Sequence, residues 1–150
     1  MSLSILVLSL ACSDPDTDTA AGADELMLQD LEAALEGYES WDHAPEWPGV
    51  EASATSHDAF TEVFFNEVSF ATYEAQAGGE MPVGAVIAKQ SWKDAEATEE
   101  ANFTAMMKVE GTGWFWASWD PSGEPVLTGQ PALCTGCHAG GQDGVMVVSW

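Results

Sequence analysis

The chain has 150 residues, of which 46% are hydrophobic, so it is long and apolar enough for one domain with a single core. It carries 25 acidic residues against three lysines, which gives a net charge of −22. This imbalance excludes binding to nucleic acid or to an anionic membrane surface through charge, and it favours a cationic redox partner protein.

The first twelve residues predict export. Residues 3–10, LSILVLSL, form an apolar run that is too short to span a bilayer but has the length of a signal-peptide core. Cys12 follows this run directly after a small residue, which is typical of lipoprotein processing. We therefore predict a signal peptide with a lipobox over residues 1–12, and a periplasmic lipoprotein attached to the membrane only by a lipid on Cys12. A frayed apolar terminus is the alternative.

An acidic linker and a helix are predicted next. Residues 13–24, SDPDTDTAAGAD, are acidic and rich in small residues, which predicts a disordered segment. Residues 25–39 then place leucines at helical spacing, with Asp24 as the expected N-cap. This helix is expected to open a single domain that spans residues 25–150.

The middle of the chain predicts strands. Residues 60–74 begin with a strand-like pattern and change to a helical one after Asn66. Three further strands are expected from apolar or alternating patterns, at residues 83–92, 102–111 and 113–120. The predicted fold class is therefore α+β, with an N-terminal helix plus an antiparallel β-sheet.

The stretch ALCTGCHAGG near the end contains the pattern C-x-x-C-H. Two thiols three positions apart can each add to one vinyl group of the same porphyrin, and the next histidine then lies under the iron. Cys134 and Cys137 are thus predicted to carry one covalent haem c per chain, with His138 as the metal ligand. A redox pair or half of a zinc site is less favoured, because neither a βαβ context nor a fourth ligand is recognisable. His43 and His57 are expected to be isolated surface histidines.

The sixth coordination position of the iron is expected to be vacant. Met146 is the nearest methionine, eight residues after His138, and an extended chain can span that distance. It belongs to the run VMVVSW, residues 145–150, which predicts a terminal strand, and methionines in apolar runs more often belong to a core. Methionine ligation is the alternative.

Four stretches together resemble the cytochrome P-460 family and its relatives, the cytochromes c′-beta. They are YESW, PVGAVIAKQ, MMKVEGTGWFW and CTGCH, at residues 38–41, 82–90, 106–116 and 134–138. The resemblance implies an N-terminal helix, an antiparallel sheet and a haem with an open distal site. It also implies action on a small nitrogen-containing molecule, by hydroxylamine oxidation or nitric oxide binding, and a homodimer as one expected state. The alternative function is a simple periplasmic electron-transfer cytochrome with a six-coordinate haem.

Lys89 is the residue for which pattern and resemblance agree most closely. It shares a predicted strand face with Ala85 and Ile87, where an unpaired ammonium would be costly and its pKa would fall. The resemblance implies that Lys89 bonds to the porphyrin edge, as the corresponding lysine does in cytochromes P-460. Pairing with a haem propionate is the alternative.

The resemblance also implies roles around the distal face. Phe60 and Phe64 are candidates for an apolar lid, and Glu110 for the carboxylate that accepts protons from hydroxylamine. The chain has no arginine, which some members use near the distal face, and this counts against full hydroxylamine-oxidising competence. Lys108 is expected to pair with Glu110 or with a haem propionate.

Overall fold

The computed structural model describes residues 15–75 and 79–146, with side chains from residue 22 onward. The predicted signal peptide with Cys12, and residues 147–150 of the predicted terminal strand, lie outside the described residues. The elements, in chain order, are α1 (Pro15–Ala34), η1 (Tyr38–Ser40), β1 (Glu51–Ala52), β2 (Phe60–Phe65), α2 (Glu67–Glu74), β3 (Val86–Trp92), β4 (Glu100–Val109), β5 (Gly113–Trp119), β6 (Pro125–Gly129) and α3 (Ala132–His138).

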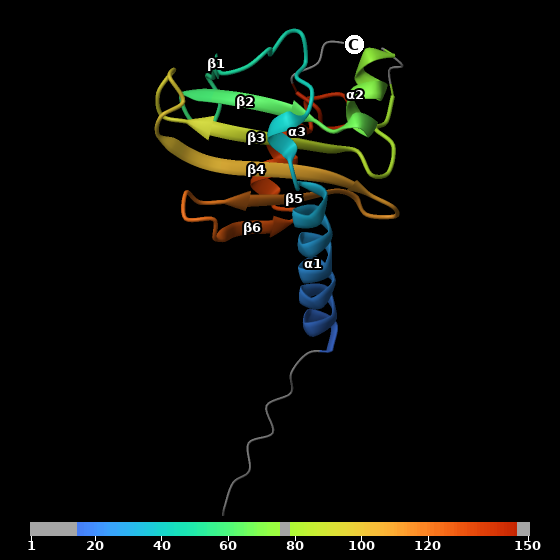
Figure 1. Ribbon diagram of the computed structural model, residues 1–150. Coiled ribbons are helices and arrows are strands. Elements are labelled where there is room, and N and C mark those ends of the chain that lie inside the picture. The colour runs from blue at the N-terminus through green and yellow to red at the C-terminus, as the bar shows by residue number, and fades with distance from the viewer. Residues whose placement is uncertain (1–14, 76–78, 147–150) are drawn as a thin grey trace, which may run out of the picture.

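The strands form one six-stranded antiparallel sheet in which neighbours along the chain are also neighbours in space (Figure 1). Antiparallel neighbours need only short connections, so the sheet forms without crossovers. In the described part of the chain, three α-helices and the short 3-10 helix η1 lie outside the sheet. The predicted α+β class, with an N-terminal helix and an antiparallel sheet, is confirmed.

The first helix begins earlier and ends earlier than predicted. α1 starts at Pro15, so most of the segment 13–24 is helical rather than a disordered linker, and Asp24 lies inside the helix instead of capping it. Proline is well tolerated in a first turn and the alanines that follow favour helix, which explains the extension. The helix ends at Ala34, shortly before Gly37 adopts a left-handed φ of 76° and turns the chain.

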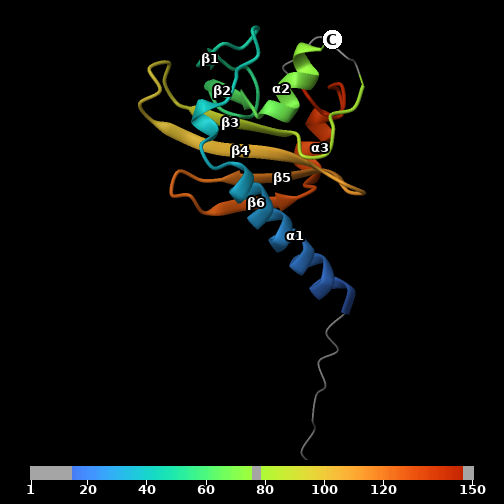
Figure 2. The ribbon, with the colours of Figure 1, turned by 45° about the vertical axis from the view of Figure 1, so that its right-hand side comes forward.

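The N-terminal half of α1 extends past the edge strand β6 (Figures 1 and 2). Leu26, just past the middle of the helix, is still 64% exposed, so the helix contributes little to the core before Met27. No helix in the described part of the chain combines the length and the apolar character needed to cross a membrane.

The face of the sheet that packs against α1 is apolar, and we call it the helix face. Ala88, Ala105 and Ala117 lie side by side across β3, β4 and β5. These small side chains let the helix approach closely, and Leu31 and Leu35 are buried against them. Protein atoms alone therefore complete this half of the core.

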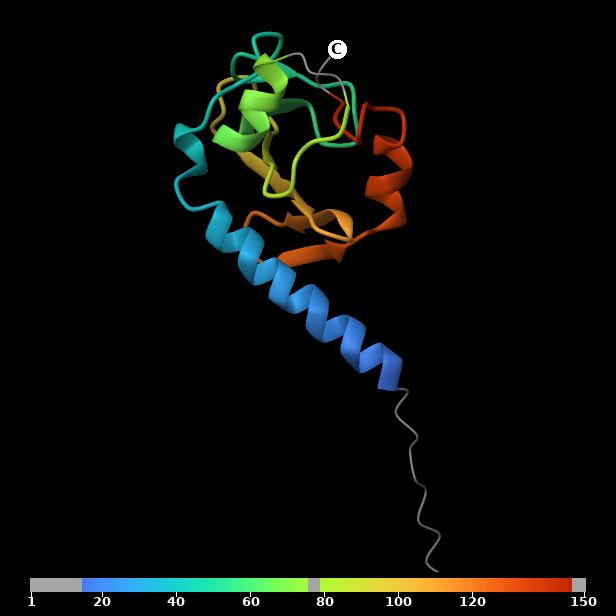
Figure 3. The same ribbon diagram turned by 90° about the vertical axis from the view of Figure 1, so that its right-hand side faces the viewer.

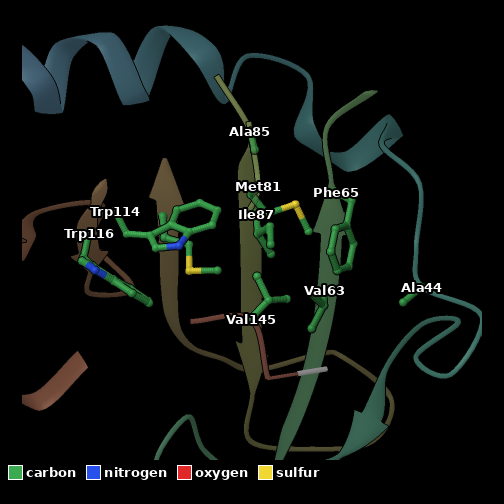
Figure 4. Packing of buried hydrophobic residues seen from close by; sticks show 10 residues of the cluster. Ala44, Val63, Phe65, Met81, Ala85, Ile87, Trp114, Trp116 and Val145 are labelled. Carbon is green, nitrogen blue, oxygen red and sulfur yellow. The ribbon is translucent and has the colours of Figure 1, made fainter. Parts of the chain in front are cut away.

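The opposite face carries the alternate residues of the same strands, because successive side chains of a strand point to opposite sides. Val63, Ile87 and Trp116 belong to this face, and Val145 from the C-terminal loop packs over them (Figure 4). Figure 3 shows α3 and the C-terminal end of α1 on opposite sides of the sheet. We call this second side the cavity face.

The predicted change from strand to helix after Asn66 is confirmed. Asn66 caps α2, because its Oδ1 accepts hydrogen bonds from Ser69 N at 2.9 Å and from Val86 N at 3.0 Å. Its Nδ2 donates to Gly84 O at 2.9 Å. One side chain thus ties β2, α2 and the start of β3 together, and this fixes the position of the strand that carries Lys89.

Two strands were not predicted. β1 has only two residues, and four of the five residues of β6 are exposed, so neither carries the apolar alternation that marks a strand in sequence. β6 exists because it pairs with β5, and its position brings the chain to the start of α3. Tertiary pairing, rather than local pattern, decides both strands.

Candidate functional site

A cavity lies between α3 and the cavity face of the sheet. It is partly open to solvent and has a volume of about 250 Å³, a little below the roughly 300–1,000 Å³ of typical cofactor and ligand sites. The exposed apolar side chains Leu127, Leu133 and Met146 also line it. No aspartate or glutamate among the described residues lines the cavity.

The two cysteines lie on α3, which forms one wall of this cavity. Cys134 and Cys137 are three positions apart in a helix, so both side chains fall on the same helix face and both line the cavity. Both are free thiols, and burial raises the pKa of Cys134 above its ordinary value. Their shared orientation is the one that double attachment to a single flat group requires.

His138, at the end of α3, is oriented by a backbone carbonyl. Its Nδ1 donates a hydrogen bond to Gly144 O at 2.6 Å, which leaves the lone pair of Nε2 available as a metal ligand. The ring of Trp116 lies against the imidazole, with 4.5 Å between ring centroids. Burial lowers the pKa of His138, which favours the neutral form that binds metals.

A network around Asp143 holds the loop that supplies this carbonyl. Lys108 Nζ donates to both carboxylate oxygens of Asp143, at 2.7 and 2.9 Å, and Met81 N donates to Oδ2 at 2.7 Å. Trp114 Nε1 donates to the Asp143 carbonyl. The expectation that Lys108 pairs with Glu110 is therefore wrong, because a partner 35 residues away along the chain takes the lysine.

Close packing in this loop requires glycine at position 141. A Cβ on Gly141 would meet the Val145 carbonyl and would come within 2.9 Å of Met146 Sδ. Gly141 N donates to His138 O at 3.0 Å, so the chain folds back tightly over the end of α3. The glycine-rich sequence after His138 is thus explained by close approach of backbone to backbone.

Lys89 lies on the cavity floor, on the face of Ile87, as predicted. It pairs in register with Val63 on one side and Thr104 on the other, and no residue in the described part of the chain forms a hydrogen bond or ion pair with its Nζ. Burial lowers the pKa of Lys89 to about 8. The cavity thus contains a cation that the protein itself leaves without an anion.

Trp116 provides a second unsatisfied donor beside Lys89. Its Nε1 is buried and has no hydrogen-bond partner among the described residues, although its side chain lines the cavity. Leaving such a group unpaired costs about 1–3 kcal/mol, so a bound acceptor is expected. Carboxylates on a bound group would supply acceptors for Trp116 and for Lys89.

His57 lines the same cavity, so the expectation of an isolated surface histidine is wrong for this residue. Its ring centroid lies 6.2 Å from that of His138, and the two rings are nearly perpendicular at 88°. Burial, with smaller contributions from Lys89 and His138, lowers the pKa of His57 to about 4. No local motif marks His57, and only folding of the loop before β2 brings it to the site. His43 instead contacts Phe64 outside the cavity.

Three predicted distal residues lie elsewhere. Phe64 points to the helix face and packs in that half of the core, and Phe60 lies on the same side by strand alternation. Neither lines the cavity. Glu110 is exposed in the turn after β4 and does not line it either. The positions of Phe60 and Phe64 therefore do not support a role as an apolar lid, and the position of Glu110 does not support a role as proton acceptor. Val63, from β2, lines the cavity in place of the phenylalanines.

The residues around the cavity fit a covalently bound haem. Two thiols on one helix face, a histidine with a free ring nitrogen, an apolar floor and two unpaired donors match its vinyl groups, iron, ring and carboxylates. A metal ion alone is not favoured, because the described residues contain no cluster of three His, Cys, Asp or Glu side chains able to hold one.

The fold and the site together define a small α+β cytochrome of the c type. The sequence profile of the Cytochrome P460 family matches residues 35–148, so the chain belongs to the cytochrome P460 family. This confirms the resemblance, and membership implies a covalently bound haem. A comparison with curated proteins returned no match.

Proposed function

We propose that the chain is a monohaem c-type cytochrome that binds a small nitrogen species, nitric oxide above all, at the haem face away from His138. One observation carries this proposal. The C-x-x-C-H residues of α3 line a cavity with an apolar strand floor, and the His138 ring is fixed with Nε2 available.

Each cavity residue has a separate task in this proposal. Cys134 and Cys137 would hold the haem through thioethers to its vinyl groups, and His138 would bind its iron. Lys89 and Trp116 would donate to the propionates, which would supply the acceptors that no described residue provides. The lining is mostly apolar, which suits an uncharged diatomic molecule. The haem, when bound, supplies the iron that coordinates the ligand.

Nitric oxide fits the site better than hydroxylamine. Oxidation of hydroxylamine releases protons and so requires a base close to the reacting nitrogen. No carboxylate lines the cavity in the described ranges, and Glu110 is exposed elsewhere. Binding of nitric oxide transfers no proton and needs no such group. Hydroxylamine oxidation is therefore the second choice, with Lys89 as the remaining basic candidate.

A simple electron-transfer role is the other candidate function, and the position of His57 favours it. A second imidazole near the iron would give the six-coordinate centre that carriers use. The 25 acidic residues would then attract a cationic redox partner. In either role we propose an exported protein, attached through a lipid on Cys12 and active in the periplasm, on the strength of the apolar run at residues 3–10.

Addition of nitric oxide to the reduced protein tests the proposal. Formation of a nitric oxide adduct in the visible spectrum is expected, whereas an unchanged spectrum over minutes would favour the electron carrier. Mass analysis of the haem peptide after proteolysis decides the state of Lys89. A haem peptide that also carries the Lys89 peptide would establish the cross-link and return hydroxylamine oxidation to first place.

A further inference from the structure

His57 is held in place by its own loop. The segment between β1 and β2 is closed by a hydrogen bond from Ser53 N to Ala59 O at 2.8 Å. Inside it, His57 N donates to Thr55 Oγ1 at 3.3 Å, and Asp58 adopts a left-handed φ of 84°. The loop thus has a defined shape that turns the imidazole of His57 into the cavity.

The two cavity imidazoles are spaced as a ligand pair. With metal–nitrogen distances of about 2 Å, two imidazoles on opposite sides of one metal have ring centroids roughly 6 Å apart. The rings of His57 and His138 are 6.2 Å apart, and their 88° angle is that of two axial ligands in perpendicular orientation. Simple packing would explain nearness, but it would not require both rings to face one cavity.

The ring of His57 is also chemically free to bind. Within the described ranges its ring forms no hydrogen bond, whereas His43 Nδ1 donates to Val63 O at 2.8 Å and His43 Nε2 lies 3.7 Å from Glu62 Oε1. Imidazole is a good ligand for iron. Among the described residues no His, Cys, Asp or Glu joins the pair to make a three-residue metal site, so the two histidines would hold iron with a porphyrin supplying further coordination positions.

We propose that His57 is the second axial ligand of the haem iron in the resting protein, and that a small ligand must displace it. This rests on the proposed function, because it takes haem attachment at His138 as given. His57 belongs to a loop rather than to the sheet, so it can leave the iron without disturbing a strand. Ligand binding is then limited by release of His57, as expected when the competent state is only partly populated.

The test compares the haem-loaded wild-type protein with His57→Ala, and with His43→Gln as the matched control. We expect a low-spin ferric wild type whose electron paramagnetic resonance signal is strongly anisotropic, as perpendicular axial imidazoles produce. His57→Ala should become high-spin, and added imidazole should restore the low-spin state. His43→Gln should match the wild type. A high-spin wild type, or a low-spin signal retained in His57→Ala, would overturn the assignment.

A second variant keeps the proposal open to test if His57→Ala does not fold. His57→Met should replace the imidazole signature by the near-infrared band of methionine ligation, and an unchanged wild-type spectrum in this variant would count against His57. Nitric oxide separates this proposal from the proposed function. At least tenfold faster binding to reduced His57→Ala than to wild type supports both. If nitric oxide binds the wild type and His57→Ala at equal rates and both proteins contain high-spin iron, only the His57 proposal is wrong. If nitric oxide binds neither protein, only the proposed nitric oxide function is wrong.

Discussion

The two faces of the sheet are made by the same strands and solve different problems. On the helix face, Ala88, Ala105 and Ala117 form a row of small side chains under α1. The chain neighbours of Ala88 and Ala105 are Lys89 and Thr104, which pair with each other and form the corresponding row on the cavity face. The first row is covered by leucines, and the second leaves an ammonium without a counter-ion among the described residues.

This difference teaches which part of the core the chain completes by itself. Burial of apolar atoms against apolar atoms needs no further partner. A buried ammonium and the indole N–H of Trp116 each need an acceptor, so the cavity face is complete only when another molecule provides one. Substitutions on the helix face should therefore change stability, and substitutions on the cavity face should also change spectra.

Leu31→Ala is expected to have the largest effect and to act on the helix face alone. Leu31 is fully buried, so the cavity left behind should lower the free energy of unfolding by about 3 kcal/mol. Urea unfolding measures this, and the haem spectrum should stay unchanged. Leu26→Ala, at a residue 64% exposed, should change stability by less than about 0.5 kcal/mol. If Leu31→Ala instead shifted the haem spectrum and left the free energy of unfolding unchanged, the two faces would not act independently.

Lys108→Met should lower the free energy of unfolding by about 2 kcal/mol, because it leaves the carboxylate of Asp143 without its cation. The two side chains are only 13% and 14% exposed, so water compensates poorly. The haem spectrum should change as well, since the same loop orients His138. Asp143→Asn in the Lys108→Met background should recover part of the loss.

Lys93→Met is the matched control for this ion pair. Lys93 pairs with Glu99 at 2.5 Å, but the two side chains are 50% and 65% exposed. Removal of this exposed pair should leave both the free energy of unfolding and the spectrum close to unchanged. Equal losses in Lys93→Met and Lys108→Met would show that the Asp143 network has no special role.

Gly141→Ala should lower the free energy of unfolding by about 1–2 kcal/mol through overpacking against the backbone of Val145. Because the displaced loop contains Gly144, the absorption of the haem should shift slightly. Gly49→Ala, where an added Cβ meets nothing within 4 Å, is the control and should be close to neutral. If the haem spectrum of Gly141→Ala stayed unchanged, the packing of this loop would not control the orientation of His138.

A pH dependence from Lys89 is also expected, in protein produced without haem. The unfolded chain holds the Lys89 proton up to about pH 10.4, whereas the folded chain releases it near pH 8. The unfolded state therefore binds more protons between these values, so stability should rise with pH across this window. Relative to Lys89→Met, the wild type should gain about 2 kcal/mol between pH 8 and pH 10.

Haem attachment should remove most of this slope, because a propionate or a covalent bond supplies the missing partner. The free energy of unfolding of both proteins, measured at pH 7.5 and pH 10 with and without haem, gives the comparison. Equal slopes in wild type and Lys89→Met without haem would show that Lys89 is not penalised by burial.

Local patterns predicted the parts of the site that lie close together in sequence. The C-x-x-C-H spacing places two thiols on one face of a helix, and Asn66 marks the change from β2 to α2. The alternation in β3 placed Lys89 beside Ile87 on a buried face. In each case the signal and the structure it specifies span only a few residues.

Positions set by long-range packing could not be predicted in this way. Phe64 was assigned to the wrong side because β2 is buried on both faces, so its apolar pattern does not identify the cavity side. Asp143 and His57 are polar residues in loops without a periodic pattern. Their partners, Lys108 and His138, are far away along the chain.

The sequence by itself determined the α+β class and the C-x-x-C-H motif, with the two cysteines and the histidine that would hold a haem. It could do so because the spacing of residues within one helical turn or one strand carries that information. Only the tertiary structure decided that Glu110 lies outside the site and that His57 lies inside it. The physical reason is that a strand's neighbours and a loop's direction depend on contacts across the sheet. Those contacts are set by the packing of the whole domain rather than by the residues next to each side chain.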